Sequence, residues 1–381
     1  MKVKAAVLAA PDAGKWDIQE IEVGDPVAGE VQVKLTVSGL CHSDEHLLTG
    51  ATPVPFHPVL GGHEGAGVVT KVGDGVTGLK EGDHVVLAFI PACGKCRPCS
   101  KGLQNLCDLG AGLLTGEAIA DGTFRYTTAD GKPIMPMCLL GTFSPYVTVH
   151  EASVVKIEDD VPLDKAALLG CGVSTGWGSA TEIGGTKAGD TVVVMGCGGV
   201  GMNAVQGAAA AGARYVVAVD PVESKREKAM EMGATHAFAS MAEAMQPVAD
   251  MTWGTMADVT IETVGDVQGE DIKACTDITG KGGTIVVTGM GDASKEDVKL
   301  SLFELTLLQK RVQGAIFGGV SPRTQIPHLL NMYRSGQLKL DELITKEYKL
   351  SEINEGYQDM RDGKNIRGII RYTEEDYAGV K

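Results

Sequence analysis

Seven residues with side chains that zinc prefers fall into two groups of very different spacing. Four cysteines lie in one short stretch of the chain, at Cys93, Cys96, Cys99 and Cys107. The other three residues are scattered far apart, at Cys41, His63 and Cys171. A bound metal holds its ligands within a few ångströms of one another. The chain must therefore fold so that one site forms locally and the other forms from distant segments.

The four-cysteine stretch has the spacing of a closed zinc site, which plays a structural role. We expect a zinc lobe over about residues 91–110. Free or oxidised thiols are one alternative, and a non-enzymatic zinc module that binds nucleic acid is another. The chain has 34 Lys and Arg residues against 49 Asp and Glu residues, a net charge of −15. This charge argues against nucleic acid as a partner.

The scattered group supplies two thiolates and one imidazole, one ligand short of a tetrahedron. An open fourth position is typical of a catalytic zinc. A zinc held in this way lowers the pKa of an alcohol oxygen, and hydride can then leave the neighbouring carbon toward a nicotinamide. Asp44 and Glu64 are candidate carboxylates that orient His63 and tune the metal. Taken singly, Cys171 or His63 is more often a core residue.

The same reaction also requires a path for a proton. Ser43 and His46 are three residues apart, so a helix that starts near residue 43 would place them on one face. A hydroxyl beside the substrate oxygen could then pass the proton through the cofactor ribose to a solvent-facing histidine. The alternative is that Ser43 caps this helix.

A glycine-rich turn stands between an apolar strand, 191–195, and a helix, about 200–211. This context distinguishes a dinucleotide-binding turn from a chance match. Gly196 permits the tight turn, Gly198 lets the backbone approach a pyrophosphate, and Gly201 allows close packing of helix on strand. The turn comprises Gly196, Cys197, Gly198, Gly199, Val200 and Gly201.

Asp220 ends the next expected strand, 215–219, a position at which a carboxylate binds the adenosine ribose. A carboxylate there repels a 2′-phosphate, so the sequence favours NAD over NADP. Lys225 and Arg226 could in principle soften this preference. The alternative is that Asp220 only begins a turn before Pro221.

A chain of 381 residues is long enough for two domains. We expect a β-rich, partly open barrel domain over residues 1–172 and 317–381, and a doubly wound parallel sheet, an α/β domain, over residues 173–316. Expected strands are 3–8, 31–37, 65–76, 83–89, 191–195, 215–219, 257–262 and 283–287. Expected helices are 200–211, 223–231, 325–334 and 351–361.

The first residues contain a short apolar run after Lys2 and Lys4. The run is too short for an export signal and reads better as a strand. No stretch approaches the roughly 20 apolar residues of a membrane span. We therefore expect a cytoplasmic protein with no membrane partner.

These motifs are similar to those of the zinc-dependent medium-chain alcohol dehydrogenases, over nearly the whole chain. The resemblance implies a GroES-like catalytic domain, a Rossmann domain, and two zinc ions per subunit held by the two groups above. It implies that Ser43 and His46 relay protons, that Asp44 is the partner of the ligand histidine His63, and that Glu64 can reach the catalytic zinc. For the cofactor site it implies His42, Thr175, Gly196, Gly198, Gly199, Val200, Gly201, Asp220, Lys225 and Arg367. His42 stands where many members carry an arginine on the pyrophosphate.

Several segments resemble more closely the actinobacterial NDMA-dependent alcohol dehydrogenases, which are nicotinoproteins. These segments are 41–46, 89–93, 104–111, 203–208 and 302–310. The resemblance implies that NAD(H) stays bound and is reoxidised in place by another carrier, experimentally a nitrosoaniline dye and physiologically a carrier such as mycofactocin. A conventional dehydrogenase that exchanges NAD, or one that oxidises thiol–formaldehyde adducts, is the alternative.

The family resemblance also bears on substrate and assembly. It implies a small-molecule alcohol or aldehyde as substrate, with Phe89, Leu139 and Leu140 as pocket walls. It further implies a homo-oligomer, a dimer or a tetramer, in which sheets of the nucleotide domain pair edge to edge. Buried edge strands near residues 314–317 would fit that arrangement.

Overall fold

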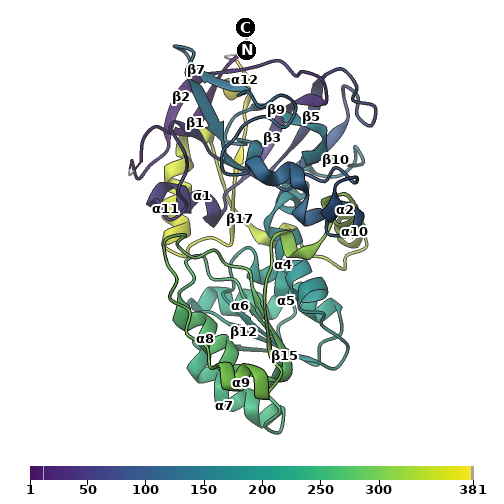
Figure 1. The fold of residues 1–381 in the computed structure, drawn as a ribbon, viewed down its shortest axis with the longest axis vertical. Helices are drawn as coiled ribbons and strands as arrows, with labels where there is room; N and C mark the ends of the chain where they lie inside the picture. The colour runs from purple at the N-terminus through teal and green to yellow at the C-terminus, as the bar shows by residue number, and fades with distance from the viewer. Residues whose placement is uncertain (12, 379–381) are drawn as a thin grey trace. The chain divides into compact units, whose positions relative to one another are not determined.

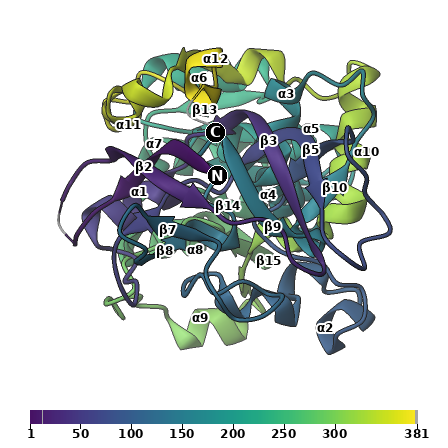
Figure 2. The same cartoon turned by 90° about the horizontal axis from the view of Figure 1, so that it is seen from above.

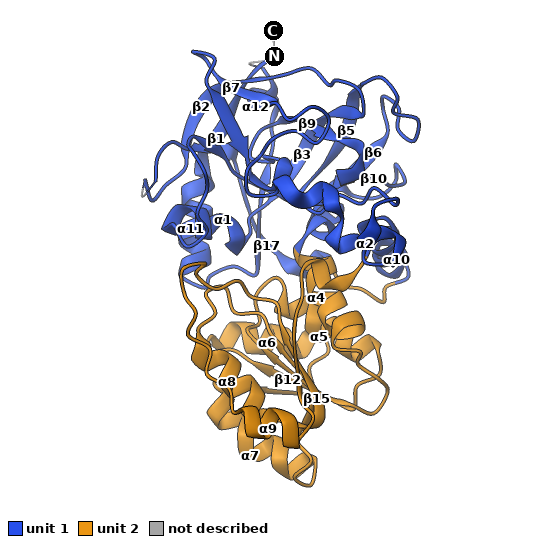
Figure 3. Ribbon diagram, in the orientation of Figure 1, with its two compact units in different colours: residues 1–171, 321–335, 340–381 blue, residues 172–320, 336–339 orange. Residues whose placement is uncertain are grey.

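The computed structural model describes residues 1–11 and 13–378 and divides into two compact units (Figure 3). Unit 1 comprises residues 1–171, 321–335 and 340–381, and unit 2 comprises residues 172–320 and 336–339. The expected boundaries lie at 172 and 317. Unit 2 also includes the short segment Gly336–Lys339, because the backbone N–H of Lys339 donates to Gln206 Oε1 at 2.8 Å.

Unit 1 contains a closed barrel and a second sheet. The barrel order is β1 (Lys2–Leu8), β2 (Asp17–Val23), β7 (Tyr126–Thr128), β8 (Pro133–Pro136) and β4 (Val59–Leu60). The second sheet has the order β10 (Val154–Lys156), β6 (His84–Leu87), β5 (Gly65–Val72), β3 (Glu30–Gly39), β18 (Arg367–Arg371) and β17 (Ile344–Tyr348), and β9 (Tyr146–His150) also pairs with β3. The expected barrel was partly open. The observed barrel closes because β1 pairs with β2 on one edge and with β4 on the other.

Helices of unit 1 are short, and two of them place residues near the site described below. They are α1 (His42–Thr49), α2 (Arg97–Ser100), α3 (Leu163–Ala167), α10 (Pro322–Arg334), α11 (Ile353–Arg361) and α12 (Glu374–Tyr377). Helices α1 and α11 lie side by side in both views (Figures 1 and 2), and Arg361 Nη1 lies 2.8 Å from Glu45 Oε1. This ion pair fixes α1 against a helix more than three hundred residues later in the chain.

Unit 2 is built on one parallel sheet of six strands. Their order is β13 (His236–Phe238), β12 (Tyr215–Val219), β11 (Thr191–Met195), β14 (Ala257–Glu262), β15 (Thr279–Val287) and β16 (Arg311–Gly314). Numbered within the unit, this order is 3-2-1-4-5-6, which is the doubly wound arrangement. The predicted fold class is therefore confirmed. The strand order reverses between β11 and β14, where such sheets bind their ligands beyond the carboxyl ends of the strands.

Apolar strands explain why this sheet forms. Val193 of β11, Val217 of β12 and Ile285 of β15 are fully buried. They pack in one core with Val248 and Ile278, which belong to two of the helices. The helices of unit 2 are α4 (Gly172–Gly178), α5 (Gly201–Ala210), α6 (Glu223–Glu231), α7 (Met241–Met251), α8 (Gly269–Ile278) and α9 (Leu302–Leu307).

The last strand of this sheet is open to solvent. All four residues of β16 are exposed in the single chain, and the strand ends at Gly314, so residues 315–317 of the expected edge strand lie beyond it. The strand is exposed because β15 covers one edge of β16 and no described strand pairs with the other. None of the described helices combines the length and apolar character needed to cross a membrane.

Candidate active site

The three scattered residues lie together in unit 1, and a carboxylate joins them. Cys41, His63, Glu64 and Cys171 each place a ligand atom within 4.8 Å of the others. Cys41 precedes α1, His63 and Glu64 lie between β4 and β5, and Cys171 follows a short helical turn. A hydrogen bond between the two sulfurs lowers the pKa of Cys41 well below its usual range and raises the pKa of Cys171. One thiolate is thus already favoured, as a metal ligand requires.

Asp44 stands directly behind the histidine of this cluster. Its Oδ2 lies 3.0 Å from His63 Nδ1, and its Oδ1 accepts a hydrogen bond of 2.7 Å from the backbone N–H of Gly62. Burial opposes protonation of His63, but the Asp44 carboxylate and Cys41 outweigh it and raise the pKa of His63. Because Nδ1 faces Asp44, the other ring nitrogen, Nε2, is left for a metal.

Glu64 is held by Arg367, which the resemblance assigned to the cofactor pyrophosphate. The guanidinium pairs with Glu64 Oε2 and donates to the backbone carbonyl of Leu40 at 3.3 Å. Both side chains are buried, and burial raises the pKa of Glu64. Within unit 1, Arg367 is therefore engaged beside the thiol cluster, and a role toward a cofactor remains a proposal.

Helix α1 carries the expected proton-handling residues. It begins at His42 with Cys41 as N-cap, so the alternative that Ser43 caps the helix is wrong. Ser43 Oγ lies 3.9 Å from Cys41 Sγ. His46 is buried rather than solvent-facing, and its ring stands edge-on to the ring of His42 with centroids 5.3 Å apart.

The four-cysteine cluster is compact and forms no disulfide. Cys93 Sγ and Cys99 Sγ are 4.0 Å apart, and Cys96 Sγ and Cys107 Sγ are 3.8 Å apart. A tetrahedron with Zn–S bonds of about 2.3 Å has edges of about 3.8 Å. Backbone N–H groups point at the sulfurs, including that of Asp108 at 3.4 Å from Cys96 Sγ. The donor set and its spacing fit zinc.

The glycine-rich turn joins β11 to α5 as expected. Gly196 has φ +90°, and a side chain at Gly201 would collide with the Gly196 carbonyl oxygen, so both positions require glycine. A Cβ added at Gly198 would meet nothing within 4 Å. Gly199 and Val200 lead into the helix, and Val200 is its N-cap. The open space at Gly198 and the N-terminus of α5 beside it fit a dinucleotide pyrophosphate.

Three of the other side chains assigned to the cofactor site belong to unit 2, as this turn does. Asp220 Oδ2 accepts a 2.8 Å hydrogen bond from the N–H of Cys197, and Oδ1 accepts a 2.9 Å bond from the N–H of Val222. Asp220 therefore stabilises the turn at Pro221 through its bond to Val222, and it also contacts the glycine-rich segment through its bond to Cys197. Lys225 is half-buried on α6. Thr175 on α4 is buried, and among the described residues its Oγ1 has no hydrogen-bond partner.

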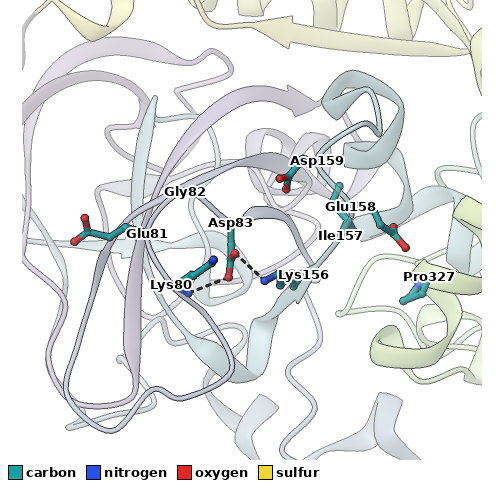
Figure 4. A pocket seen from close by; sticks show the side chains of 9 residues that line it. All are labelled: Lys80, Glu81, Gly82, Asp83, Lys156, Ile157, Glu158, Asp159 and Pro327. Carbon is teal, nitrogen blue, oxygen red and sulfur yellow. Dashed lines mark hydrogen bonds and ion pairs between the residues drawn. The ribbon is translucent and has the colours of Figure 1, made fainter.

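A surface pocket of about 680 Å³ lies elsewhere in unit 1 (Figure 4). Lys156 Nζ lies 2.8 Å from Asp83 Oδ1 at its centre, and Asp83 Oδ2 accepts from the N–H of Lys80 at 2.9 Å. Its lining contains none of the predicted site residues. The cluster of Cys41, His63, Glu64 and Cys171 is thus separate from this pocket.

Sequence reasoning missed one side chain and one ion pair that support the cluster. The Tyr357 hydroxyl donates to the Cys41 carbonyl at 3.4 Å, from a helix far along the chain. The pairing of Glu64 with Arg367 was also not expected. The available signal was Glu64, a charged residue in an apolar, glycine-rich stretch. A carboxylate that is buried in such a stretch requires a cationic partner.

Comparison with known proteins agrees with both units. The model of the alcohol dehydrogenase GroES-like domain matches residues 27–159, and that of the zinc-binding dehydrogenases matches residues 199–335. Alcohol dehydrogenase B of Mycobacterium tuberculosis is 54% identical over 99% of this chain and 100% of its own. The NDMA-dependent alcohol dehydrogenase of Amycolatopsis methanolica is 54% identical over 98% and 100%.

A solved structure is also similar to this chain over nearly its whole length. That of benzyl alcohol dehydrogenase from Acinetobacter calcoaceticus is 30% identical, covers 98% of this chain and 100% of its own, and has a TM-score of 0.89. The predicted pairing of a GroES-like and a Rossmann fold is confirmed, and the non-enzymatic zinc module is wrong. The chain therefore belongs to the zinc-dependent medium-chain alcohol dehydrogenases, which are oxidoreductases with an NAD(H)-binding fold.

Proposed function

We propose that the protein interconverts alcohols and aldehydes with Cys41, His63 and Cys171 as the ligands of a catalytic zinc. The observation that carries this proposal is the buried donor set within 4.8 Å, with Asp44 fixed behind His63. When bound, zinc supplies a Lewis acid for the substrate oxygen, and NAD supplies a hydride acceptor. Glu64 is a further oxygen donor at the same site.

The chain's own residues then orient the metal and move the proton. Asp44 fixes the ring of His63 and leaves one nitrogen free to ligate. Ser43 Oγ, beside Cys41, accepts the alcohol proton while its own hydroxyl proton passes on toward His46 of the same helix. Cys93, Cys96, Cys99 and Cys107 hold a second zinc that stabilises their lobe.

For the cofactor we propose that Gly196, Gly198 and Gly201 seat the pyrophosphate with Gly199 and Val200, and that Asp220 binds the adenosine ribose. Thr175, Lys225, His42 and Arg367 complete the proposed set. The open space at Gly198 and the unpartnered Thr175 Oγ1 support this assignment.

We further propose that NAD(H) stays bound and is reoxidised by an external carrier of the mycofactocin kind. The support is the 54% identity to a relative whose name states dependence on NDMA. To test this, extensively desalted protein is denatured and its NAD(H) is assayed per chain. Near-stoichiometric NAD(H), with turnover on a nitrosoaniline dye but not on added NAD, is expected. An empty protein that turns over with added NAD would instead identify a conventional dehydrogenase.

Substrate class follows from the apolar side chains near the cluster. The Phe89 ring lies edge-on to the His63 ring, with centroids 5.7 Å apart, and Leu139 and Leu140 are buried. A relative of known structure acts on benzyl alcohol, as its name states. We propose small to medium apolar alcohols. Turnover that required a low-molecular-weight thiol would favour a formaldehyde-adduct substrate instead.

A second copy of the chain is the proposed partner of the open sheet edge. Beside β16, helix α9 exposes Leu302 (75%), Phe303 (74%) and Leu307 (66%). An unpaired edge with such neighbours favours association with another edge. Phe303→Asp should lower the molar mass measured by light scattering. An unchanged mass, or a monomeric parent, would contradict the proposed homo-oligomer.

A further inference from the structure

Unit 2 contains a buried carboxylate with no role in the function proposed above. Glu262 is the last residue of β14, and its side chain is fully buried. In the register it stands opposite Met195 of β11 on one side and Val287 of β15 on the other. A carboxylate in the middle of a sheet loses its hydration, so a charged group there must be held by strong donors.

The two oxygens of Glu262 bind the two loops that follow neighbouring strands. Oε1 accepts from the backbone N–H of Val264 in the loop after β14, and Oε2 accepts from the N–H of Gly289, in the loop after β15, at 3.0 Å. The Glu262 carbonyl also accepts from the N–H of Thr288 at 3.0 Å. Gly289 must be glycine here, because a Cβ would lie 2.7 Å from Oε1 and 2.9 Å from Oε2.

The loop after β14 is in turn attached to the first glycine of the dinucleotide turn. Thr263 donates from its N–H to the Met195 carbonyl at 2.8 Å and from Oγ1 to the Gly196 carbonyl at 2.6 Å. Glu262 and Thr263 together therefore connect the segments that follow three neighbouring strands, β11, β14 and β15, at the carboxyl edge of the sheet. This edge is where a doubly wound sheet binds its dinucleotide.

The position of Glu262 relative to Asp220 indicates which half of the dinucleotide it serves. Each half of such a sheet binds one mononucleotide, and the pyrophosphate lies at the switch point between them. Asp220 follows β12, on one side of Gly196, and is proposed to hold the adenosine ribose. The loops that Glu262 joins follow β14 and β15, on the other side, where the nicotinamide half must lie.

We propose that Glu262 is a positioning residue that holds the β14 and β15 loops together as the seat of the nicotinamide half of NAD(H). It touches no reacting atom and acts through the backbone of Val264 and Gly289. This inference rests on the NAD(H) site proposed above. Loosening the seat should speed release of the dinucleotide and leave the zinc clusters, which are in unit 1, intact.

The test compares Glu262→Gln with Glu270→Gln, an exposed glutamate in the first turn of α8 that gives the same change in charge. Gln at position 262 keeps one acceptor and turns the other into a donor that faces an N–H. The readouts are the NADH dissociation constant and the half-time of release of NADH from loaded protein during dialysis. The expected result is affinity about tenfold weaker and faster release for Glu262→Gln alone. The zinc content of both variants should equal that of the parent, because both cysteine clusters lie in unit 1.

Glu262→Asp serves as a second variant if Glu262→Gln does not fold. It keeps the charge but is one methylene too short for both loops, so its release rate should exceed that of the parent. Parent-like NADH affinity and release in the folded Glu262 variants would overturn the proposal, as would an equal loss in Glu270→Gln. A parent that loses NAD(H) on desalting would refute tight retention only, since the difference in NADH affinity between variants would still be measured.

Discussion

The two zinc-type clusters have similar ligand chemistry but are built in opposite ways. The four-cysteine cluster comes from one short segment, and its Sγ pairs are already 3.8 Å and 4.0 Å apart. The other cluster joins residues 41, 63 and 171, from three separate segments. Two buried side-chain pairs support it, Asp44 with His63 and Arg367 with Glu64.

Because one cluster is local and the other is assembled from distant segments, the two depend on the fold in different ways. A closed set of four thiolates from one loop shapes that loop itself, so its metal contributes folding energy. A set assembled by β3, α1 and the β4–β5 connection is held in place by the surrounding sheets. Its metal can therefore keep an open position for chemistry. The predictions below test this division of roles.

The largest effect should come from removing a proposed catalytic ligand. We expect Cys41→Ser to lose one zinc per chain and on the order of 10³-fold or more in turnover, because Lewis-acid stabilisation is worth several kcal/mol. The fold should persist, since the sheets do not depend on this metal. Elemental zinc and turnover are the measurements. Cys138→Ala, a buried cysteine outside both clusters, should retain both zinc ions. Near-normal turnover of Cys41→Ser would refute the ligand assignment.

The next effect should be on stability and should come from the other cluster. Cys96→Ser opens the four-thiolate set, and we expect its thermal midpoint to fall by on the order of 10 °C. Cys41→Ser should change the midpoint much less. Differential scanning calorimetry of both variants checks this contrast. Equal destabilisation by the two substitutions would contradict the claim that only the four-cysteine cluster contributes substantially to folding.

A smaller effect should follow from changing the carboxylate behind His63. Asp44→Asn keeps the Oδ1 acceptor for Gly62 but removes the charge that faces His63 Nδ1. We expect zinc affinity at this site to fall about 10- to 100-fold. Competition with a graded chelator measures it. Asp83→Asn, at the separate surface pocket, is the control and should leave zinc affinity unchanged.

The smallest effect concerns Glu262 and depends on pH. Burial raises the pKa of Glu262 from 4.5 to about 7, with Asp271 and Cys275 as the titratable groups near it. A carboxyl whose folded pKa is raised binds more protons when folded, so stability declines as pH rises between the two values. From pH 6 to 8 we expect the parent to lose about 1 kcal/mol relative to Glu262→Gln. Denaturant unfolding at both values of pH measures this difference, and parallel pH profiles would contradict it.

Much of the architecture could be predicted because its determinants are local. The strands 191–195, 215–219 and 257–262 were predicted at their observed bounds, since the first two are apolar runs and the third alternates apolar and polar residues. The barrel's closure and the exposure of β16 could not be predicted. They depend on which strands pair, and no pattern within β1 or β16 encodes the partner.

The sites, too, could be predicted where their residues are close in the sequence and not where the fold brings them together. The short spacing of Cys93 to Cys107 is enough to predict a cluster, whereas Cys41 and Cys171 are brought together only by the topology of unit 1. Glu262 could not be recognised, because Thr260-Ile261-Glu262-Thr263 reads as the end of a strand. Its partners are backbone amides of loops whose positions the sequence does not reveal.

Anomalous diffraction at the zinc absorption edge on crystals of the parent protein tests the two-cluster account most directly. The account predicts two zinc peaks per chain. One should be surrounded by the sulfurs of Cys93, Cys96, Cys99 and Cys107, and the other by Cys41 Sγ, Cys171 Sγ and a ring nitrogen of His63. A single peak, or a second peak away from Cys41 and His63, would contradict the account.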